Sequence, residues 1–398
     1  MEITGRFSTA VCYAKVIEDE AIDQIRRMCD CQFTEGAKIR IMPDVHAGKG
    51  CTIGTTMTVT DKAVPNLVGV DIGCGMYTVN LGRAEIDLAR FDEAAHFVPS
   101  GFDVWERRQE YFDLSDLRYS LGIKDSRRVE CSLGTLGGGN HFIEIDRTQD
   151  GTNYLVIHSG SRSLGRHAAQ YYQELAIIFQ QWKGEYIRKR DEIIRTYKEQ
   201  GRQKEIQAAL EALRAEVHEE MIPEDLCYVE GENLDNYIHD IRICQAFARR
   251  NREKIAEVLL TKTGLAGGEG FHTVHNYIDT DEMILRKGAI AAHEGELVLI
   301  PINMRDGSVL ARGKGNLEWN YSAPHGAGRI MSRSRAKEEL SLEEYRAAMQ
   351  GVYTTSVGAD TLDEAPMAYK SLDDIVDVIA ESVELIEVMK PVYNFKAG

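Results

Sequence analysis

The sequence predicts a mixed α/β fold of the α+β kind, in which β-sheets surround a central site and one helical insertion interrupts them. Three observations lead to this prediction. Short apolar runs broken by Gly and Asp fill residues 1–160, a segment rich in Glu, Lys, Arg, Gln, Ala and Leu follows at 166–260, and strand-like, glycine-rich sequence returns at 284–332. Apolar runs bounded by turn residues are typical of strands, and helical spacing with few glycines is typical of helices.

The individual elements follow from these patterns. The expected strands are the apolar runs at 39–42, 57–59, 67–70, 76–79, 142–145, 154–157 and 297–302. Helices are expected at 170–197, 204–220, 234–260, 341–350 and 372–389, so that the insertion at 166–260 forms a helical hairpin followed by a third helix. Because no Pro-rich or low-complexity linker divides the chain, one domain spanning residues 1–398 is expected.

Composition excludes several classes of protein. With 43% hydrophobic and 28% charged residues the chain is typical of soluble globular proteins, and no apolar run approaches the ~20 residues of a membrane span. The first residues lack the pattern of a secretory signal, and the 8 cysteines form no CxxC pair. A cytoplasmic protein with reduced thiols is therefore expected. The net charge of −16 argues, taken alone, against nucleic acid as a partner.

Glycine gathers beside His, Cys, Asp and Arg in blocks spread along the chain. These blocks lie at 43–48, 70–75, 137–144, 158–162 and 325–329, and a histidine-rich block at 272–276 follows Gly270. Glycine allows a positive φ or a close approach of backbone to a ligand. Six such blocks indicate one site assembled from loops.

Five residues of these blocks are suitable ligands for a transition metal: Asp71, Cys74, His141, His158 and His275. They combine a carboxylate, imidazoles and one thiolate, and five ligands exceed the need of one tetrahedral zinc. If Cys74 bridges, two metals share the set, which suits phosphoryl chemistry. The alternative is that each histidine is an ordinary polar residue, as we assume for His46, His272 and His293. Asp44 and His46 are expected at most to help organise the metal pocket.

His325 lies outside the ligand set, in a Gly-Ala-Gly context with Arg329 four residues on. An imidazole with backbone space around it can act as a covalent nucleophile toward a phosphoanhydride. Arg329 is then placed to stabilise the developing phosphate charge. The alternative is a glycine-rich turn capped by a histidine.

The ordered set of blocks resembles the RtcB RNA ligase family. The resemblance rests on 43–48, 69–75, 137–145, 158–162, 286–289 and 325–333, together with the helical segment 237–252, and covers essentially the whole chain. It implies a single-domain ligase that depends on GTP and on two Mn²⁺ ions. The implied reaction joins RNA ending in a 2′,3′-cyclic phosphate or 3′-phosphate to RNA with a 5′-hydroxyl. A histidine is guanylylated, GMP passes to the RNA 3′-phosphate, and the 5′-hydroxyl displaces it, in RNA repair or tRNA splicing.

The resemblance also assigns roles by position. Asp71, Cys74 and His141 match the ligands of one manganese, Cys74, His158 and His275 match those of the other, and His325 matches the guanylylated histidine. Arg162 and Arg329 are assigned to substrate phosphates. The positions that match guanylate contacts are Asn140, Glu144, Asn276, Pro301, Asn303, Met304, Ser308, Gly326, Ala327, Gly328 and Lys396.

Two departures from the family pattern stand out. Asn303-Met304-Arg305-Asp306 replaces a turn of smaller residues, and the chain ends Lys396-Ala397-Gly398 rather than Lys-Gly. They suggest a divergent bacterial branch whose RNA target differs from the spliced tRNA.

Two other functions stay open at this point. One is a metal-dependent RNA cyclic-phosphate phosphoesterase without guanylylation, and the other is a non-catalytic RNA-binding scaffold that uses the helical insertion for docking. The charge excludes none of the three, because it is uneven: 338–387 holds two basic and thirteen acidic side chains, whereas 305–337 holds seven basic and two acidic ones. Phosphate binding depends on local positive charge.

Overall fold

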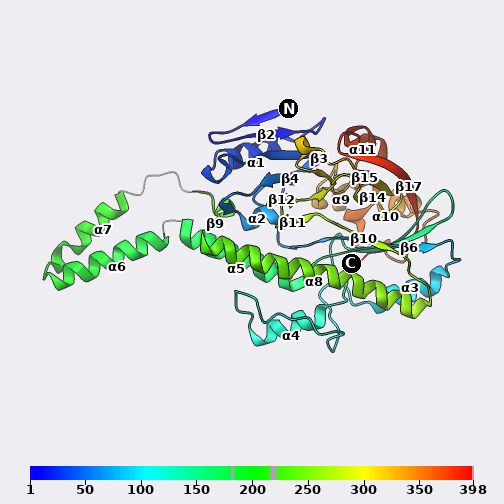
Figure 1. The fold of residues 1–398 in the computed structure, drawn as a ribbon, viewed down its shortest axis with the longest axis horizontal. Helices are drawn as coiled ribbons and strands as arrows, with labels where there is room; N and C mark the ends of the chain where they lie inside the picture. The colour runs from blue at the N-terminus through cyan, green and yellow to red at the C-terminus, as the bar shows by residue number, and fades with distance from the viewer. Residues whose placement is uncertain (181–182, 216–221, 397–398) are drawn as a thin grey trace.

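Two β-sheets form the body of the molecule (Figure 1). The computed structural model describes residues 1–180, 183–215 and 222–396. The first sheet has the order β1 (Glu2–Thr4), β2 (Thr9–Cys12), β3 (Ile39–His46), β4 (Ile53–Thr58), β12 (Ile284–Lys287) and β11 (Asn276–Asp279). The second has the order β10 (Gly270–Val274), β6 (Gly75–Gly82), β8 (Asn153–Ser159), β7 (Phe142–Arg147), β17 (Val383–Lys396), β15 (Gly307–Gly313) and β14 (Leu297–Asn303). Strands from both halves of the chain thus meet in each sheet.

Short ribbons and helices complete the body. The two-stranded ribbons are β5 (Lys62–Ala63) with β9 (Val229–Glu230), and β13 (Ala289–Ala291) with β16 (Ser322–Pro324). The helices are α1 (Asp19–Cys29), α2 (Pro65–Val68), α3 (Leu88–Phe97), α4 (Ile123–Ser132), α5 (Arg162–Gln180), α6 (Lys183–Glu199), α7 (Ile206–Ala215), α8 (Glu232–Thr263), α9 (Arg333–Glu339), α10 (Leu342–Ala348) and α11 (Leu372–Ile379). The mixed α/β fold expected from the sequence is confirmed.

Helix α8 connects the hydrophobic core to the loops of the second sheet. Apolar side chains along it, including Phe247 and Leu259, are fully buried. Two polar residues on the same helix are also buried. The Asn251 side chain donates to the carbonyls of Thr135 and Gly160, and Arg252 donates through Nη1 to the carbonyls of Gly73 and Ser159. Because buried backbone carbonyls need partners, these contacts fix the loops that carry the glycine blocks.

Two element predictions are wrong. Residues 67–70 are not a strand: Pro65 begins the short helix α2, since proline suits the first turn, and Gly69 ends it with a φ of 98°. The helix expected at 372–389 ends at Ile379, and Val383–Lys396 is strand β17. Pairing with β15 and β7 overrides the helical spacing there, and Pro391 is tolerated because it lies at a break in the register.

The segment 166–260 is helical over most of its described residues, and its helices differ in surroundings. Helices α5 and α8 lie against each other along the body, whereas α6 and α7 form an arm that extends away from it (Figure 1). Residues 181–182 and 216–220 of the predicted helices lie outside the described residues. Among the helices described, none is long and apolar enough to cross a membrane.

Candidate active site

The register of the second sheet brings the predicted metal ligands to one edge. Gly75 at the start of β6 pairs with Ser159 at the end of β8 on one side and with Val274 at the end of β10 on the other. Phe142 at the start of β7 pairs with His158. Neighbouring strands are antiparallel, so the start of one lies beside the end of the next. Cys74, His141, His158 and His275 therefore meet at the same edge although up to 201 residues of sequence separate them.

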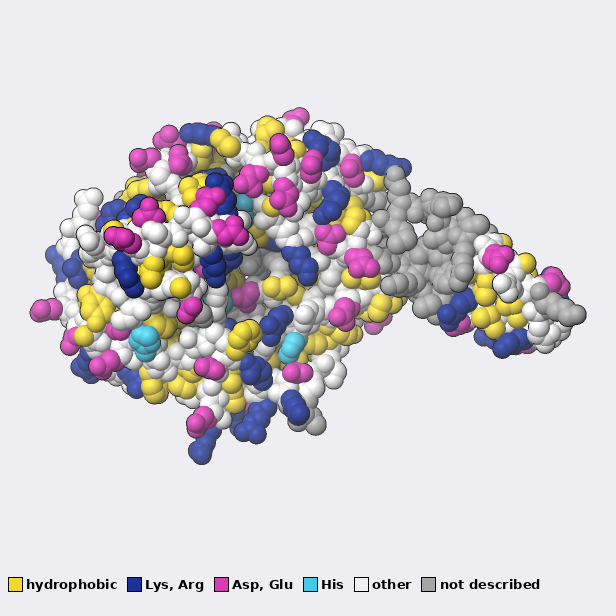
Figure 2. All heavy atoms as spheres, turned by 180° about the vertical axis from the view of Figure 1, so that it is seen from behind, with side chains coloured by type: hydrophobic (Ala, Val, Ile, Leu, Met, Phe, Trp, Pro, Cys, Tyr) yellow, Lys and Arg dark blue, Asp and Glu magenta, His cyan; other side chains and the backbone are white. Residues whose placement is uncertain are grey.

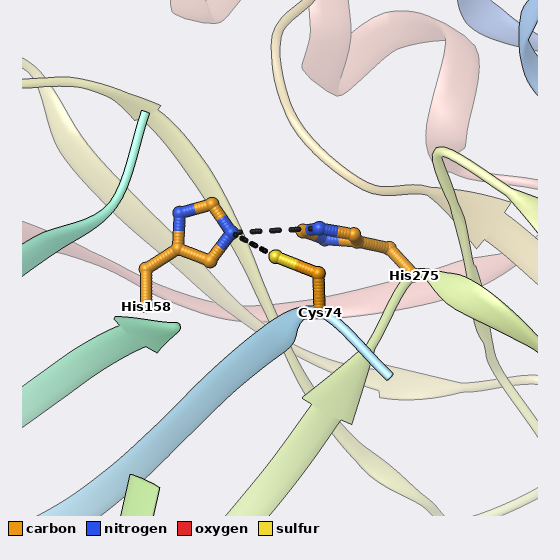
Figure 3. A group of neighbouring side chains, drawn as sticks. All are labelled: Cys74, His158 and His275. Carbon is orange, nitrogen blue, oxygen red and sulfur yellow. Dashed lines mark hydrogen bonds between the residues drawn. The ribbon is translucent and has the colours of Figure 1, made fainter. Parts of the chain in front are cut away.

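Three of these side chains converge on one point (Figure 3). His158 Nε2 lies 3.4 Å from Cys74 Sγ and 3.4 Å from His275 Nε2. The other ring nitrogen of His158, Nδ1, lies 3.0 Å from the carbonyl of Asn140, which can only accept, so Nδ1 carries the hydrogen. The Nε2 lone pair consequently points at the other two side chains. This arrangement fits a cation among them.

The remaining two ligands form a second group around the same thiol. His141 Nε2 lies 3.4 Å from Cys74 Sγ and 3.1 Å from Asp71 Oδ2, and its Nδ1 donates to the carbonyl of Leu136. Gly160 makes this group possible, because a Cβ there would lie 2.2 Å from Asp71 Oδ1. Cys74 thus belongs to both groups of donors, so its thiolate is placed to bridge two metal ions.

The electrostatics of this cluster suit metal binding. Burial lowers the pKa of His158 and of His275 well below the usual value, which keeps both imidazoles neutral with lone pairs available. Burial also raises the pKa of the Cys74 thiol, so the thiolate form needs a neighbouring cation. Although burial acts in the opposite direction, the neighbouring His141 and Arg162 lower the pKa of Asp71. Neutral imidazoles beside one carboxylate and one thiol fit a divalent transition metal.

A cavity of about 190 Å³ opens beside His158 and His275. His325 lies in its wall with its ring 4.9 Å from that of His275. The Nδ1 of His325 lies 2.6 Å from Oδ2 of Asp44, a fully buried carboxylate that can only accept when ionised. His325 Nε2 therefore keeps its lone pair. A Cβ on Gly328 would lie 2.9 Å from the carbonyl oxygen of Asp44, so the glycine allows this close approach.

Most of the predicted nucleotide contacts line this cavity, which we call the histidine cavity. These are Asn140, Glu144, Pro301, Asn303, Met304, Gly326, Ala327, Gly328 and Lys396, together with Arg329. Two predicted contacts do not line it. Asn276 uses Oδ1 to accept from the amide of Gly288, and Ser308 is fully buried behind the wall. Asn303 lines the cavity, but its Oδ1 accepts from the amides of Arg305 and Asp306 in its own turn.

The cations of the histidine cavity gather on one buried carboxylate, Glu364 of the turn Leu362–Glu364. It lies 3.4 Å from Arg329, 2.9 Å from Arg333, and in direct contact with Lys396 Nζ. Burial acts to raise its pKa, but Lys396 and Arg333 lower the pKa to about 2. Lys396 is held there because it ends strand β17, where it pairs with Phe142 of β7. Glu364 thus keeps three cations at one end of the cavity.

A second cavity of about 400 Å³ reaches the metal-ligand cluster from the other side. Asp71, His141 and Arg162 line it, and Asn140 lines both cavities. Arg162 donates to Thr135 Oγ1 and to the carbonyl of Gly101. The further lining residues include Arg128, Arg166 and Phe102, whose side chain is 80% exposed. We call this the arginine cleft.

Figure 2 shows the opposite face from Figure 1, where Lys, Arg and acidic side chains surround a hollow in which histidine is visible.

The comparison with protein families decides the relationship of this chain. The model described as tRNA-splicing ligase RtcB matches residues 24–115 and 120–397. The chain belongs to the RtcB family. Its relatives include the RNA-splicing ligase RtcB of Escherichia coli strain K12, with 32% identity over 90% of each chain. RNA-splicing ligase RtcB2 of E. coli strain ATCC 25922 is 28% identical over 96% of this chain and 93% of its own. The tRNA-splicing ligase RtcB of Aeropyrum pernix is 26% identical over 95% and 92%.

Several side chains of this RtcB-family site have no role in the predictions from sequence. Arg333, Glu364, Tyr369 and Asn394 all line the histidine cavity, and so does His46, which we had treated as ordinary. His46 was within reach of prediction, because it belongs to the block at 43–48. Arg333 was also within reach, because it ends the block at 325–333 that carries the resemblance. Glu364, Tyr369 and Asn394 stand outside all these blocks, so no local signal separates them from surface residues.

Proposed function

We propose that this chain is a GTP- and Mn²⁺-dependent RNA ligase that joins 2′,3′-cyclic phosphate or 3′-phosphate ends to 5′-hydroxyl ends. One observation carries the proposal: a shared cluster of metal donors lies between two cavities, one holding His325 and the other lined by arginines. A ligase must bring a nucleotide and an RNA end to the same metals. The names of the relatives, which are RNA- and tRNA-splicing ligases, agree with this arrangement.

His325 is the proposed nucleophile. With Nδ1–H donated to Asp44, Nε2 can attack the α-phosphorus of GTP: an N–P bond forms, the P–O bond to the leaving group breaks, and pyrophosphate departs. The Asp44 carboxylate also stabilises the positive charge that develops on the imidazole. Asp44 is therefore a positioning residue for the nucleophile.

The histidine cavity supplies the nucleotide site in this proposal. Glu144 is placed to accept from guanine N1–H and the 2-amino group, and the backbone of 326–328 provides space for phosphate beside His325. Arg329 and Lys396 bring positive charge to the same wall. Because Asn303 is engaged in its own turn, we assign that turn a role in shaping the cavity rather than in contacting the base.

The metal donors are proposed to hold two manganese ions, with Asp71, Cys74 and His141 around one and Cys74, His158 and His275 around the other. When bound, the ions withdraw charge from phosphate oxygens and so favour attack at phosphorus. The neutral imidazoles and the bridging thiol described above are what this chain contributes.

The RNA ends are proposed to lie in the arginine cleft. Arg128, Arg162 and Arg166 offer positive charge for phosphates, and the exposed Phe102 offers a face on which a base can stack. The cleft ends at Asp71 and His141, so an RNA end held there reaches the metals from the side opposite His325. This arrangement lets the guanylate pass from one cavity to an RNA phosphate in the other.

Sealing of defined broken RNAs tests this function. Two RNAs, one ending in a 2′,3′-cyclic phosphate and one beginning with a 5′-hydroxyl, are incubated with the protein and Mn²⁺, with and without GTP. The proposal predicts a joined product only with GTP. Conversion of the cyclic phosphate to a monophosphate without joining would instead identify a phosphoesterase, and RNA binding without any conversion would identify a scaffold.

A further inference from the structure

A second hollow lined by arginines lies next to the arginine cleft. Its volume is about 470 Å³, and its walls are the loop segment 106–108 on one side and helix α4 on the other. The arginines that line it are Arg107, Arg108 and Arg127. We call this hollow the outer arginine pocket. The proposed function assigns it no role.

Helix α4 packs against α5 at the edge of the body (Figure 1) and separates the two hollows. Arg128 and Ser132 line the arginine cleft. Arg127, Glu130 and Cys131 line the outer arginine pocket. Residues three or four apart share a face of a helix, so the two sets occupy different faces of α4. Because an α-helix with its side chains is only about 10 Å across, a bound chain that leaves the cleft reaches the outer pocket by crossing one helix.

Hydrogen bonds hold the loop against α4. The amide of Trp105 donates to the carbonyl of Cys131 at 3.0 Å, and the Trp105 indole donates to the carbonyl of Gly134 at 3.0 Å. Arg128 donates to the carbonyl of Phe102. The loop and the helix are therefore joined between the two hollows, and both hollows exist in the protein without a ligand.

The arginines of the outer pocket are available to a ligand. Arg107, Arg108 and Arg127 are exposed, and none of them forms an ion pair with another described residue. Glu110 of the same loop is instead bound by Arg250 of α8 at 2.5 Å. This acid is thus neutralised by the body of the protein, while the positive charges of the loop remain free.

Two carboxylates also line the outer pocket and limit its charge. Glu106 and Glu130 stand against three arginines, which leaves a net charge of +1. The two hollows together have six arginines and three carboxylates, the third being Asp71. A modest local excess of positive charge attracts a polyanion without holding it tightly. Such a pocket suits a chain of phosphates that must leave after the reaction better than it suits a small anion.

An exposed aromatic ring accompanies the arginines at each hollow. Phe102 in the cleft is 80% exposed and Tyr111 is 65% exposed, the two highest values for aromatic side chains among the described residues. The guanidinium of Arg108, which lines the outer pocket, lies 5.6 Å from the centre of the Tyr111 ring. Exposed rings beside arginines are typical of surfaces that bind single-stranded nucleic acid, because bases stack on the rings while the cations hold the phosphates.

We propose that the outer arginine pocket binds the backbone of the RNA strand whose 3′-phosphate end lies in the arginine cleft. Of the two RNA ends, only this one carries a terminal phosphate, so it is the end that the arginines of the cleft attract. The strand then crosses α4, places phosphates against the three arginines of the outer pocket and stacks a base on Tyr111. This inference rests on the proposed function in one respect, that single-stranded RNA ends in the cleft.

The length dependence of RNA binding tests the proposal. The probes are 5′-fluorescein RNAs of about 3 and about 12 nucleotides ending in a 3′-phosphate, since sites for single strands cover about 4–16 nucleotides. Fluorescence anisotropy is measured with Mn²⁺ and without GTP, so that no strand is joined. The shorter RNA reaches only the cleft, whereas the longer one reaches both hollows. In Arg107→Gln/Arg108→Gln/Arg127→Gln we expect the longer RNA to bind about 10-fold more weakly at low salt and the shorter RNA to bind as in the wild type.

The salt dependence and a change of opposite sign separate the effect of charge from that of shape. Loss of three phosphate contacts should lower the slope of log affinity against log salt concentration by about 2, at about 0.7 per contact on a single strand. Glu130→Gln removes a negative charge from the same pocket, so it should strengthen binding of the longer RNA about twofold. A merely structural role of the pocket would weaken binding in both variants.

The control is Arg26→Gln/Arg27→Gln/Arg83→Gln, which removes the same charge from exposed arginines that line neither hollow. It should bind both RNAs as the wild type does. Equal affinity of the wild type and the outer-pocket variant for the longer RNA would overturn the proposal, as would an equal loss for both RNAs or weaker binding by Glu130→Gln. Failure of the ligase function would appear separately, as the absence of joined RNA with the length dependence intact.

Discussion

The two ends of the histidine cavity differ in how their charges are balanced. At the metal end, the Nε2 lone pair of His158 faces Cys74 Sγ and His275 Nε2, an arrangement that suits a bound cation. At the Glu364 cluster, Arg329, Arg333 and Lys396 already have a carboxylate partner within the protein. The first arrangement needs a ligand that is not part of the protein, whereas in the second each cation already has a partner in the protein. Metal binding should therefore depend on the donor cluster, whereas the stability of the fold should depend on the Glu364 cluster.

Cys74→Ala should have the largest effect, because the thiol is common to both groups of donors. We expect the affinity for Mn²⁺ to fall more than about 100-fold, beyond the loss typical of outer-shell partners, and histidine guanylylation and RNA sealing to disappear. Metal content after dialysis against Mn²⁺ measures the first effect. Cys131→Ala, at another buried cysteine outside the cluster, is the matched control and should retain the metal. Full activity in Cys74→Ala would contradict the bridging role.

Asp44→Asn should act on the nucleophile while leaving the metal end intact. The Asn side chain can turn its NH₂ group toward Nδ1, so the Nδ1–H tautomer of His325 is no longer fixed. We therefore expect guanylylation to slow by about 10²–10⁴-fold. Single-turnover rates with labelled GTP measure this loss, and Mn²⁺ affinity should not change. An unaltered rate would show that His325 does not depend on Asp44. Asp103→Asn, at an exposed carboxylate, serves as the control.

Glu364→Gln should lower the stability of the fold, because it removes the carboxylate of the Glu364 cluster. The pKa of Glu364 is depressed from 4.5 to about 2, so its ionised form stabilises the fold above about pH 4.5, and that contribution is lost as the pH falls through about 2. At pH 7 we expect a loss of up to about 3 kcal/mol in the free energy of unfolding. Urea unfolding at pH 7 measures it.

The matched control for that change is Glu339→Gln, which removes an exposed partner of Arg335 on α9 and should cost less than about 0.5 kcal/mol. Equal losses in the two variants would show that burial of the Glu364 cluster adds nothing.

Phe102→Ala should have the smallest effect and should change neither metal binding nor the Glu364 cluster. The ring is 80% exposed, so stability should not change. Loss of base stacking should weaken binding of single-stranded RNA about 10-fold without altering guanylylation. Fluorescence anisotropy with a labelled oligonucleotide measures the affinity. Unchanged RNA affinity would show that RNA does not bind in the arginine cleft.

The same contrast explains what the sequence could predict. Four of the five metal donors lie in glycine blocks, where the need for close backbone approach leaves a local signal, as at Gly160 beside Asp71. The structure brings all five predicted donors together. Glu364 and Asn394 leave no such signal in the sequence, because they reach the cavity through long-range packing.

The fold shows the same limit. Runs such as Tyr154–Ile157 were predicted as strands because their apolar pattern is local, and they lie in β8. Strand β17 was not predicted, since its first half is determined by pairing with β15 and its second half by pairing with β7, and both partners lie far away in the sequence. Local periodicity gives no information about such partners.

Formation of a covalent protein–GMP adduct tests the central claim most directly. The full chain is incubated with α-labelled GTP and Mn²⁺, and the labelled protein is examined before and after acid treatment. The account predicts an acid-labile adduct that requires Mn²⁺ and is absent from His325→Ala. No adduct in the wild type, or an equal adduct in His325→Ala, would contradict it.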